Sequence, residues 1–70
     1  MRSRFLNALV ISELPENGDW IDVPAVETAL EESYSRPTVR RALRTLRREG
    51  WIAYEENHPG GPRCRLLAAG

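Results

Sequence analysis

The segment 36–49 constrains the fold most, because its apolar and basic residues fall on opposite sides of a helix. Six arginines share one side, at Arg36, Arg40, Arg41, Arg44, Arg47 and Arg48. Four apolar residues share the other, at Val39, Ala42, Leu43 and Leu46. Ser35 is a favourable N-cap, Pro37 fits the first turn, and Gly50 is a typical terminator. The pattern predicts an amphipathic helix over 36–49.

The basic side forms a ridge, because Arg36, Arg40, Arg44 and Arg48 are spaced by four. Like charges at this spacing destabilise a helix by about 0.2–0.5 kcal/mol per pair. The chain has ten arginines and no lysine, so the choice of Arg over Lys carries little information, whereas the ridge geometry does. Taken alone, such a ridge is typical of a solvated helix face or of one paired with the acidic half of a neighbouring molecule. On the second of two helices joined by a short turn and followed by a hairpin, it favours a nucleic acid partner.

Two further helices are expected before the ridge. The first is predicted over residues 3–14, with Ser3 as its cap and Pro15 at its end. The second is predicted over residues 23–32, with Asp22 as its cap. In the second helix Val26, Ala29 and Leu30 are expected to face inward, and Glu27 and Glu31 outward. Helix 3–14 is apolar nearly all round, which indicates either cover from the rest of the chain or a homodimer contact.

Three short strands complete the pattern. Residues 20–22 predict an edge strand, and 51–56 and 63–67 predict a hairpin closed by the loop 57–62. Period-two alternation places Cys64 and Leu66 inward and Arg63 and Arg65 outward. Trp51 and Tyr54 are expected to be core aromatics, Cys64 a small buried residue, and His58 an exposed loop residue. Glu55 and Glu56 are positioned to pair with the outward arginines.

The order helix, strand, helix, turn, helix, hairpin predicts an α+β fold of the winged helix-turn-helix class, as one domain over residues 1–70. The net charge of zero hides an asymmetry. Residues 1–34 carry two arginines and seven acids, and residues 35–70 carry eight arginines and three acids. The basic surface is therefore local, and it coincides with the predicted third helix and hairpin.

Several functions are not expected. The sequence has no apolar run long enough for a membrane span and no signal-peptide pattern, which favours a cytoplasmic protein. One cysteine and one histidine do not form a zinc site within one chain, and no nucleophile set has its partners. We expect no enzyme, no catalytic residues, no cofactor, no metal and no small-molecule effector.

Residues 35–52 resemble the recognition helix of GntR-type winged-helix regulators, whose pattern is Ser-Arg-x-Thr-Val-Arg-x-Ala-Leu-x-x-Leu-x-x-x-Gly. The resemblance implies that Arg36 and Arg40 reach base edges and that Thr38 meets the DNA backbone. Arg44 and Arg48 are then phosphate contacts. Residues 61–70 look more like the wing of PadR- or MarR-type domains, and the resemblance covers about 18 of 70 residues.

The function expected from these features is sequence-specific binding of double-stranded DNA by a transcriptional regulator. The third helix would enter the major groove and the hairpin 51–67 would act as the wing. The predicted DNA-binding residues are Arg36, Thr38, Arg40, Arg41, Arg44, Arg48, Arg63 and Arg65. Two alternatives remain: a protein-interaction winged helix that uses the acidic half or the first helix, and a small accessory DNA-binding factor of phage or mobile-element type.

Overall fold

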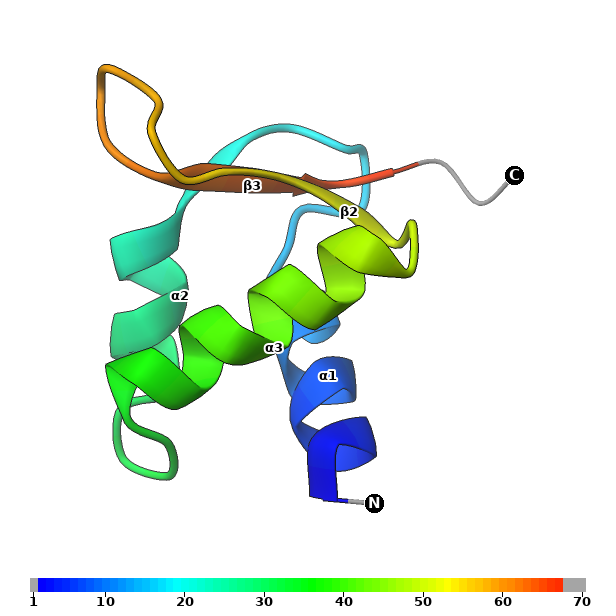
Figure 1. The fold of residues 1–70 in the computed structure, drawn as a ribbon, viewed down its shortest axis with the longest axis vertical. Helices are drawn as coiled ribbons and strands as arrows, with labels where there is room; N and C mark the ends of the chain where they lie inside the picture. The colour runs from blue at the N-terminus through cyan, green and yellow to red at the C-terminus, as the bar shows by residue number, and fades with distance from the viewer. Residues whose placement is uncertain (1, 68–70) are drawn as a thin grey trace.

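The computed structural model describes the backbone of residues 2–67 and the side chains of residues 5–67. Three helices and three strands follow one another along the chain (Figure 1). They are α1 (Arg2–Ser12), β1 (Ile21–Asp22), α2 (Val23–Ala29), α3 (Arg36–Arg48), β2 (Ile52–Glu55) and β3 (Arg63–Leu66). The expectation of an α+β fold with a short strand and a C-terminal hairpin is confirmed.

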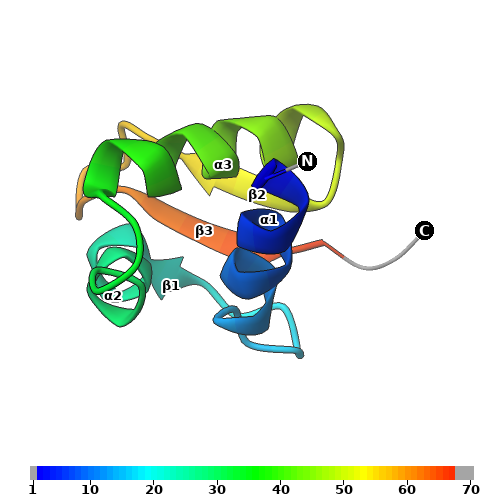
Figure 2. The ribbon, with the colours of Figure 1, turned by 90° about the horizontal axis from the view of Figure 1, so that it is seen from below.

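The strands form one antiparallel sheet in the order β1-β3-β2, so the last strand of the chain is the central one. Cys64 pairs with Tyr54 of β2 on one side and with Ile21 of β1 on the other. The helices all lie on one face of this sheet, as the views from two directions show (Figures 1 and 2). The other face of the sheet is turned away from the helices.

The core lies between the helices and the sheet, and every element except β1 contributes a buried hydrophobic residue to it. The largest fully buried side chains are Leu43, Leu46, Ile52, Val10, Val23, Val26, Val39 and Cys64. In α1, Leu6 and Val10 are one helical turn apart and face this core, and Leu14 follows from the turn after the helix. Burial at helical spacing is therefore what holds α1 against α3.

Helix α3 begins at the predicted residue and ends at Arg48, one residue before the predicted end, with Glu49 as its C-cap. The backbone N–H of Thr38 donates to Ser35 Oγ (3.4 Å), which is an N-cap bond. At the other end, Gly50 has φ +87°, its N–H donates to Arg47 O (3.1 Å), and the N–H of Trp51 donates to Leu46 O (3.0 Å). This pair of bonds is the Schellman arrangement, and it turns the chain from α3 directly into β2.

The other two helices differ from prediction at their ends. Helix α1 begins at Arg2, before the expected cap Ser3, and ends at Ser12 rather than residue 14. Helix α2 ends at Ala29 rather than residue 32, because the N–H groups of Ser33 and Tyr34 both turn back onto Leu30 O. Asp22 occupies the N-cap position, but its side chain makes no capping hydrogen bond.

Three burial predictions are wrong. Glu27 was expected to face solvent and is 3% exposed, whereas Ala29 was expected inward and is exposed. Trp51 was expected in the core and is 53% exposed. The alternation of β2 explains Trp51, because Ile52 and Tyr54 point inward and residue 51 has the opposite parity. Tyr54 and Cys64 are buried, as predicted.

Candidate nucleic-acid interface

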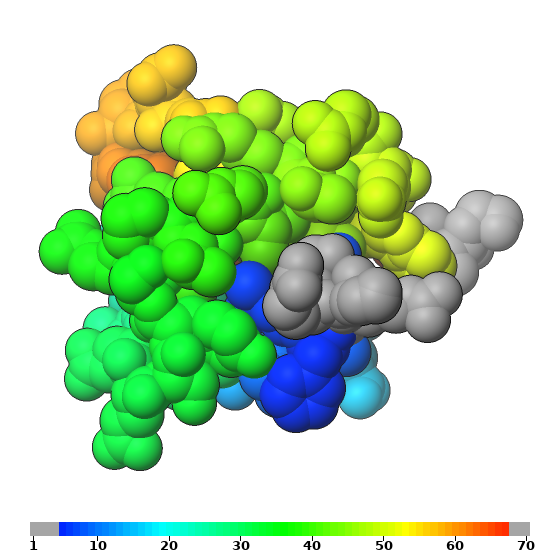
Figure 3. Space-filling view, turned by 60° about the horizontal axis from the view of Figure 1, so that its bottom comes forward, coloured from blue at the N-terminus to red at the C-terminus, as the bar shows by residue number. Residues whose placement is uncertain are grey.

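The outward side of α3 carries the arginine ridge. Its buried residues are Val39, Ala42, Leu43 and Leu46, and all of its arginines are exposed or half-buried. The predicted separation of apolar and basic sides is therefore confirmed. Side chains of α3 spread across the face presented in Figure 3, next to α1. A shallow hollow of about 510 Å³ on this helix is lined by Arg36, Pro37, Arg40, Arg41 and Arg44.

The first half of the ridge is held by one buried carboxylate. Glu27 of α2 accepts a short charge-assisted hydrogen bond from Arg40 Nε, and Arg40 Nη2 lies 3.5 Å from its Oε1. Arg36 Nε lies 3.4 Å from the same Oε1. The hydrogen bond to Glu27 raises the pKa of Arg40, so its guanidinium stays charged. The Arg36 side chain is 73% exposed and that of Arg40 33%, so Arg36 is the more available of the two.

The second half of the ridge is tied to the end of β2. Glu56 accepts from Arg44 Nη2 (3.3 Å) and from Arg47 Nη2 (3.0 Å). These two bonds, that of Arg44 first, lower the pKa of Glu56. Arg47 also donates through Nη1 to Tyr54 O (3.0 Å), and its guanidinium lies 5.1 Å from the centre of the Tyr54 ring. Arg47 therefore attaches the hairpin to α3, while Arg44 remains half-exposed.

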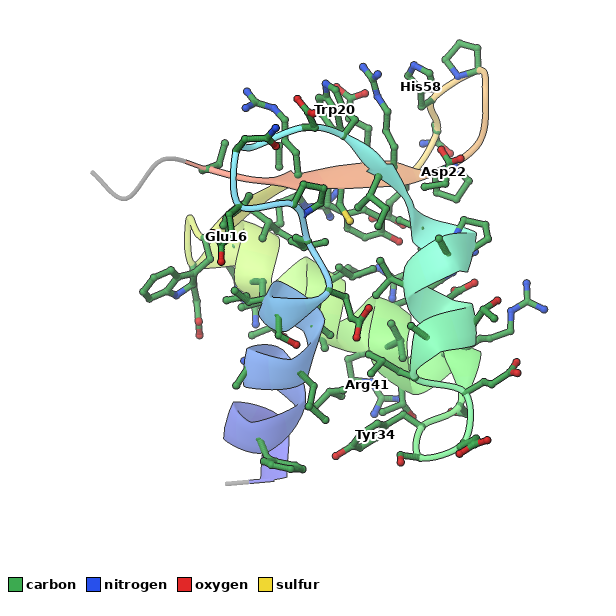
Figure 4. The ribbon with its side chains drawn as sticks, turned by 180° about the vertical axis from the view of Figure 1, so that it is seen from behind. Glu16, Trp20, Asp22, Tyr34, Arg41 and His58 are labelled. Atoms are coloured by element: carbon green, nitrogen blue, oxygen red, sulfur yellow. The ribbon has the colours of Figure 1, made fainter. Side chains whose placement is uncertain are left out.

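Arg41 and Arg48 differ from the other ridge arginines. Both are exposed, and neither has a carboxylate within ion-pair distance among the described side chains. Figure 4 shows Arg41 near Tyr34 on the side of the molecule away from the sheet. Because no carboxylate of the described side chains pairs with them, these two positions leave a local positive potential on the outer side of α3.

Thr38 lies in the cap of the same helix. Its hydroxyl is 2.8 Å from the hydroxyl of Ser35, and its backbone N–H also bonds to that oxygen. The side chain is half-buried and lies one turn before the middle of the ridge. Thr38 therefore first serves the start of α3, and it offers an anion only the part of its hydroxyl that Ser35 leaves free.

The hairpin arginines lie over a tryptophan on the outer face of the sheet. The Arg63 guanidinium is 3.8 Å from the centre of a Trp20 ring, and the Arg65 guanidinium is 5.3 Å from the centre of a Trp20 ring. Arg63 Nε also donates to Glu55 Oε1 (2.8 Å). Figure 4 shows Trp20 on the face of the sheet turned away from the helices. Stacking on an indole holds a guanidinium plane in a defined orientation. The expected outward direction of both arginines is confirmed.

The loop tip is ordered by its histidine. His58 Nδ1 accepts from the N–H of Gly60 (3.1 Å), and the N–H of Gly61 donates to His58 O (2.8 Å). This bonding occupies Nδ1 and leaves Nε2 as the remaining polar atom of the ring. The half-buried His58 therefore shapes the tip of the hairpin (Figure 4).

Sequence reasoning missed the anionic partners of the ridge. Glu27 was assigned to the surface, and Glu56 was expected to meet the hairpin arginines rather than Arg44 and Arg47. The signal for Glu27 is present but weak, since it stands four positions after Val23 and three before Leu30, both buried. Trp20 was expected only as part of an edge strand, although Arg63 and Arg65 both lie over its ring. The predicted pairing of Glu55 with Arg63 is confirmed.

Over residues 2–67, no three His, Cys, Asp or Glu side chains come together as metal ligands would. Burial raises the pKa of the Cys64 thiol to about 11, so this thiol is neutral at physiological pH. No helix within the described part of the chain has the length and hydropathy needed to cross a membrane. In comparisons with known proteins, the chain has no significant match to a family model, a curated protein or a solved structure.

Proposed function

We propose that this protein is a winged-helix domain that binds double-stranded DNA. The element order, the sheet order β1-β3-β2 and the turn between α2 and α3 support the winged-helix assignment. In this arrangement α3 is the recognition helix and the β2–β3 hairpin is the wing. A role in regulating transcription is the biological setting that we propose for this binding.

The observation that carries the proposal is the exposed basic side of α3, opposite its buried apolar side. Its hollow is lined by four arginines, Arg41 among them, and Arg48 extends the basic surface. Neither Arg41 nor Arg48 has a carboxylate partner among the described side chains. Planar guanidinium groups suit both phosphate oxygens and the acceptor edge of guanine. A surface of this kind is adapted to the phosphates and base edges of a duplex.

The arginines have different roles in this proposal. Arg36 and Arg40 contact base edges. Arg36 makes the larger contribution because its side chain is more exposed. Both are oriented by Glu27, whose carboxylate limits the rotamers that they sample. Arg41, Arg44 and Arg48, with the hydroxyl of Thr38, contact phosphates. Arg63 and Arg65, held against Trp20, contact the minor groove or its phosphates.

The proposal is tested by fluorescence anisotropy with a mixed pool of duplex DNA over a series of salt concentrations. The double variant Arg41→Ala/Arg48→Ala removes two cations that form no ion pair with a described carboxylate, so we expect the variant to fold. Affinity should fall, and the slope of log K against log salt should decrease by about 2, since each lost phosphate contact contributes about 0.9. Circular dichroism verifies that the variant is folded.

The matched control is Arg41→Lys/Arg48→Lys, which keeps both charges. It should keep most of the affinity and the full salt slope, because a lysine still neutralises a phosphate. Two results contradict the proposal: no binding of the wild-type protein at low salt, or an Ala variant that binds with the wild-type affinity and slope. Site selection with the wild-type protein then identifies the preferred sequence.

A further inference from the structure

Two large hydrophobic side chains of the chain are exposed and lack the cover that protects the third. Phe5 is 66% exposed and Trp51 53%, whereas Trp20 has two arginines stacked over it. Phe5 belongs to a stretch of α1, residues 5–12, that contains no charged residue. Its outward side consists of Phe5, Ala8 and Ser12, all exposed. An uncharged helix face with a protruding aromatic ring is typical of a contact surface.

A hollow continues this surface towards Trp51. It has a volume of about 770 Å³, and its apolar lining includes Ile11, Trp51, Leu66 and Leu67. Two acids, Glu16 and Glu49, and one arginine, Arg65, also line it. Ile11 lines the hollow and belongs to α1, so the hollow borders the helix that carries Phe5. The combined surface offers an apolar hollow with two acids and one arginine at its border.

The charges along α1 are arranged so that a second copy complements the first. Positions 2 and 4, at the N-terminal end of α1, are arginines, and Glu13 and Glu16 follow its C-terminal end. When two such helices run antiparallel, the basic end of each lies beside the acidic end of the other. When they run parallel, like charges meet at both ends. The charge pattern therefore favours a symmetric antiparallel pair.

We infer that two copies of this chain associate through α1, antiparallel about a two-fold axis at Ala8, with the Phe5 ring of each copy inserted into the hollow of the other. The register follows from the symmetry. With the axis at position 8, residue 5 of one copy lies opposite residue 11 of the other, and Ile11 lines the hollow. Residue 4 then lies opposite residue 12, next to Glu13. The small side chain of Ala8 in each copy lets the two α1 helices approach each other closely at the axis.

The hollow is necessary for the area of the contact. A helix of 11 residues is about 16 Å long, which is short for a helix pair that must be stable alone. A specific interface buries about 600 Å² or more on each partner. The aromatic contacts of Phe5 with the hollow, near Trp51, supply additional buried area at both ends of the pair. Apart from Arg65, which lines the hollow, the contact uses none of the residues proposed to bind DNA.

Sedimentation velocity over a concentration series tests the inference. The wild-type chain should form a dimer as concentration rises. Phe5→Glu should raise the dissociation constant of the dimer by about tenfold or more, because it places a carboxylate in an apolar hollow that Glu16 and Glu49 also line. Phe5 is exposed, so this variant should fold, as circular dichroism would verify. The control Asn57→Glu adds the same charge in the exposed hairpin loop and should leave dimerisation unchanged. A wild-type chain that stays monomeric at millimolar concentration, or a Phe5→Glu variant that dimerises normally, overturns the inference.

A charge exchange tests the antiparallel arrangement. The variants Arg2→Glu/Arg4→Glu and Glu13→Arg/Glu16→Arg should each be monomeric alone. In an antiparallel pair of either variant, each helix end would face an end of the other helix that carries the same charge. Their equimolar mixture should recover the dimer, because each acidic end meets a basic end. A mixture that remains monomeric, or single variants that still dimerise, would contradict this pairing. Loss of the dimer with retained DNA binding would separate this inference from the proposed function.

Discussion

Glu27 on α2 holds Arg40 on α3 through a two-point contact, with a carboxylate that is 3% exposed. A buried carboxylate needs such partners, because its desolvation is otherwise uncompensated. The same carboxylate lies 3.4 Å from Arg36 Nε. One acid from α2 thus fixes the first half of the ridge and joins α2 to α3.

We expect Glu27→Ala to lower the free energy of unfolding by about 1–3 kcal/mol, because it leaves two arginines without their shared partner. The value lies below that of a fully buried pair, since Arg36 and Arg40 both reach solvent. Urea unfolding measures the change. The control Glu31→Ala removes an exposed acid from the turn after α2 and should change stability by less than about 0.5 kcal/mol. Equal effects of the two substitutions would contradict the role of Glu27.

Arg47 and Arg48 are neighbours with different expected effects. Arg47→Ala removes the hydrogen bond to Tyr54 O and the contact with the Tyr54 ring, so it should lower stability by about 1 kcal/mol and speed amide exchange in β2. Arg48→Ala should leave both quantities nearly unchanged, because no described carboxylate pairs with Arg48. Amide exchange by NMR distinguishes the two. If Arg48→Ala opened the hairpin as Arg47→Ala does, the assignment of Arg47 would be wrong.

The stabilisation from Glu56 depends on acidity. Its pKa in the folded state lies below the ordinary 4.5, since Arg44 and Arg47 hydrogen-bond to the carboxylate. The folded state therefore favours the ionised form, and this stabilisation is complete above pH 4.5 and lost as pH falls through the lower folded pKa. Glu56→Gln should be less stable than wild type at neutral pH and converge with it in acid. A stability difference independent of pH would exclude this linkage.

The Cys64 thiol should make stability depend on pH in the opposite direction, in the alkaline range. Burial in β3 raises the pKa of its thiol from 9.0 to about 11, because the thiolate is poorly solvated there. The folded state holds its proton longer than the unfolded state, so stability should fall as pH rises above 9.0. At pH 8 a thiol reagent should modify Cys64 only as fast as the chain opens. Rapid modification of the native protein would show that the thiol is accessible.

Local patterns predicted the elements well, and α3 shows why. Its cap at Ser35, its apolar spacing and the glycine after it are all encoded within a few residues. The burial of Glu27 depends instead on how α2 packs below the start of α3, which no local pattern specifies. Trp51 was assigned to the core by its hydrophobicity, although strict alternation from Ile52 and Tyr54 places it outside. The anionic partners of the ridge come from 9 to 13 residues away along the chain, so only the tertiary fold reveals them.

The position of β3 at the centre of the sheet has a consequence for synthesis of the protein. Strands β1 and β2 do not pair with each other, so neither has a sheet partner until Arg63–Leu66 has left the ribosome. The helices can form earlier, but the sheet side of the core stays open to solvent until then. Closure of the sheet therefore requires β3 and follows its synthesis. A stalled nascent chain that ends before β3 would expose Ile52 and Tyr54 to chaperones and proteases.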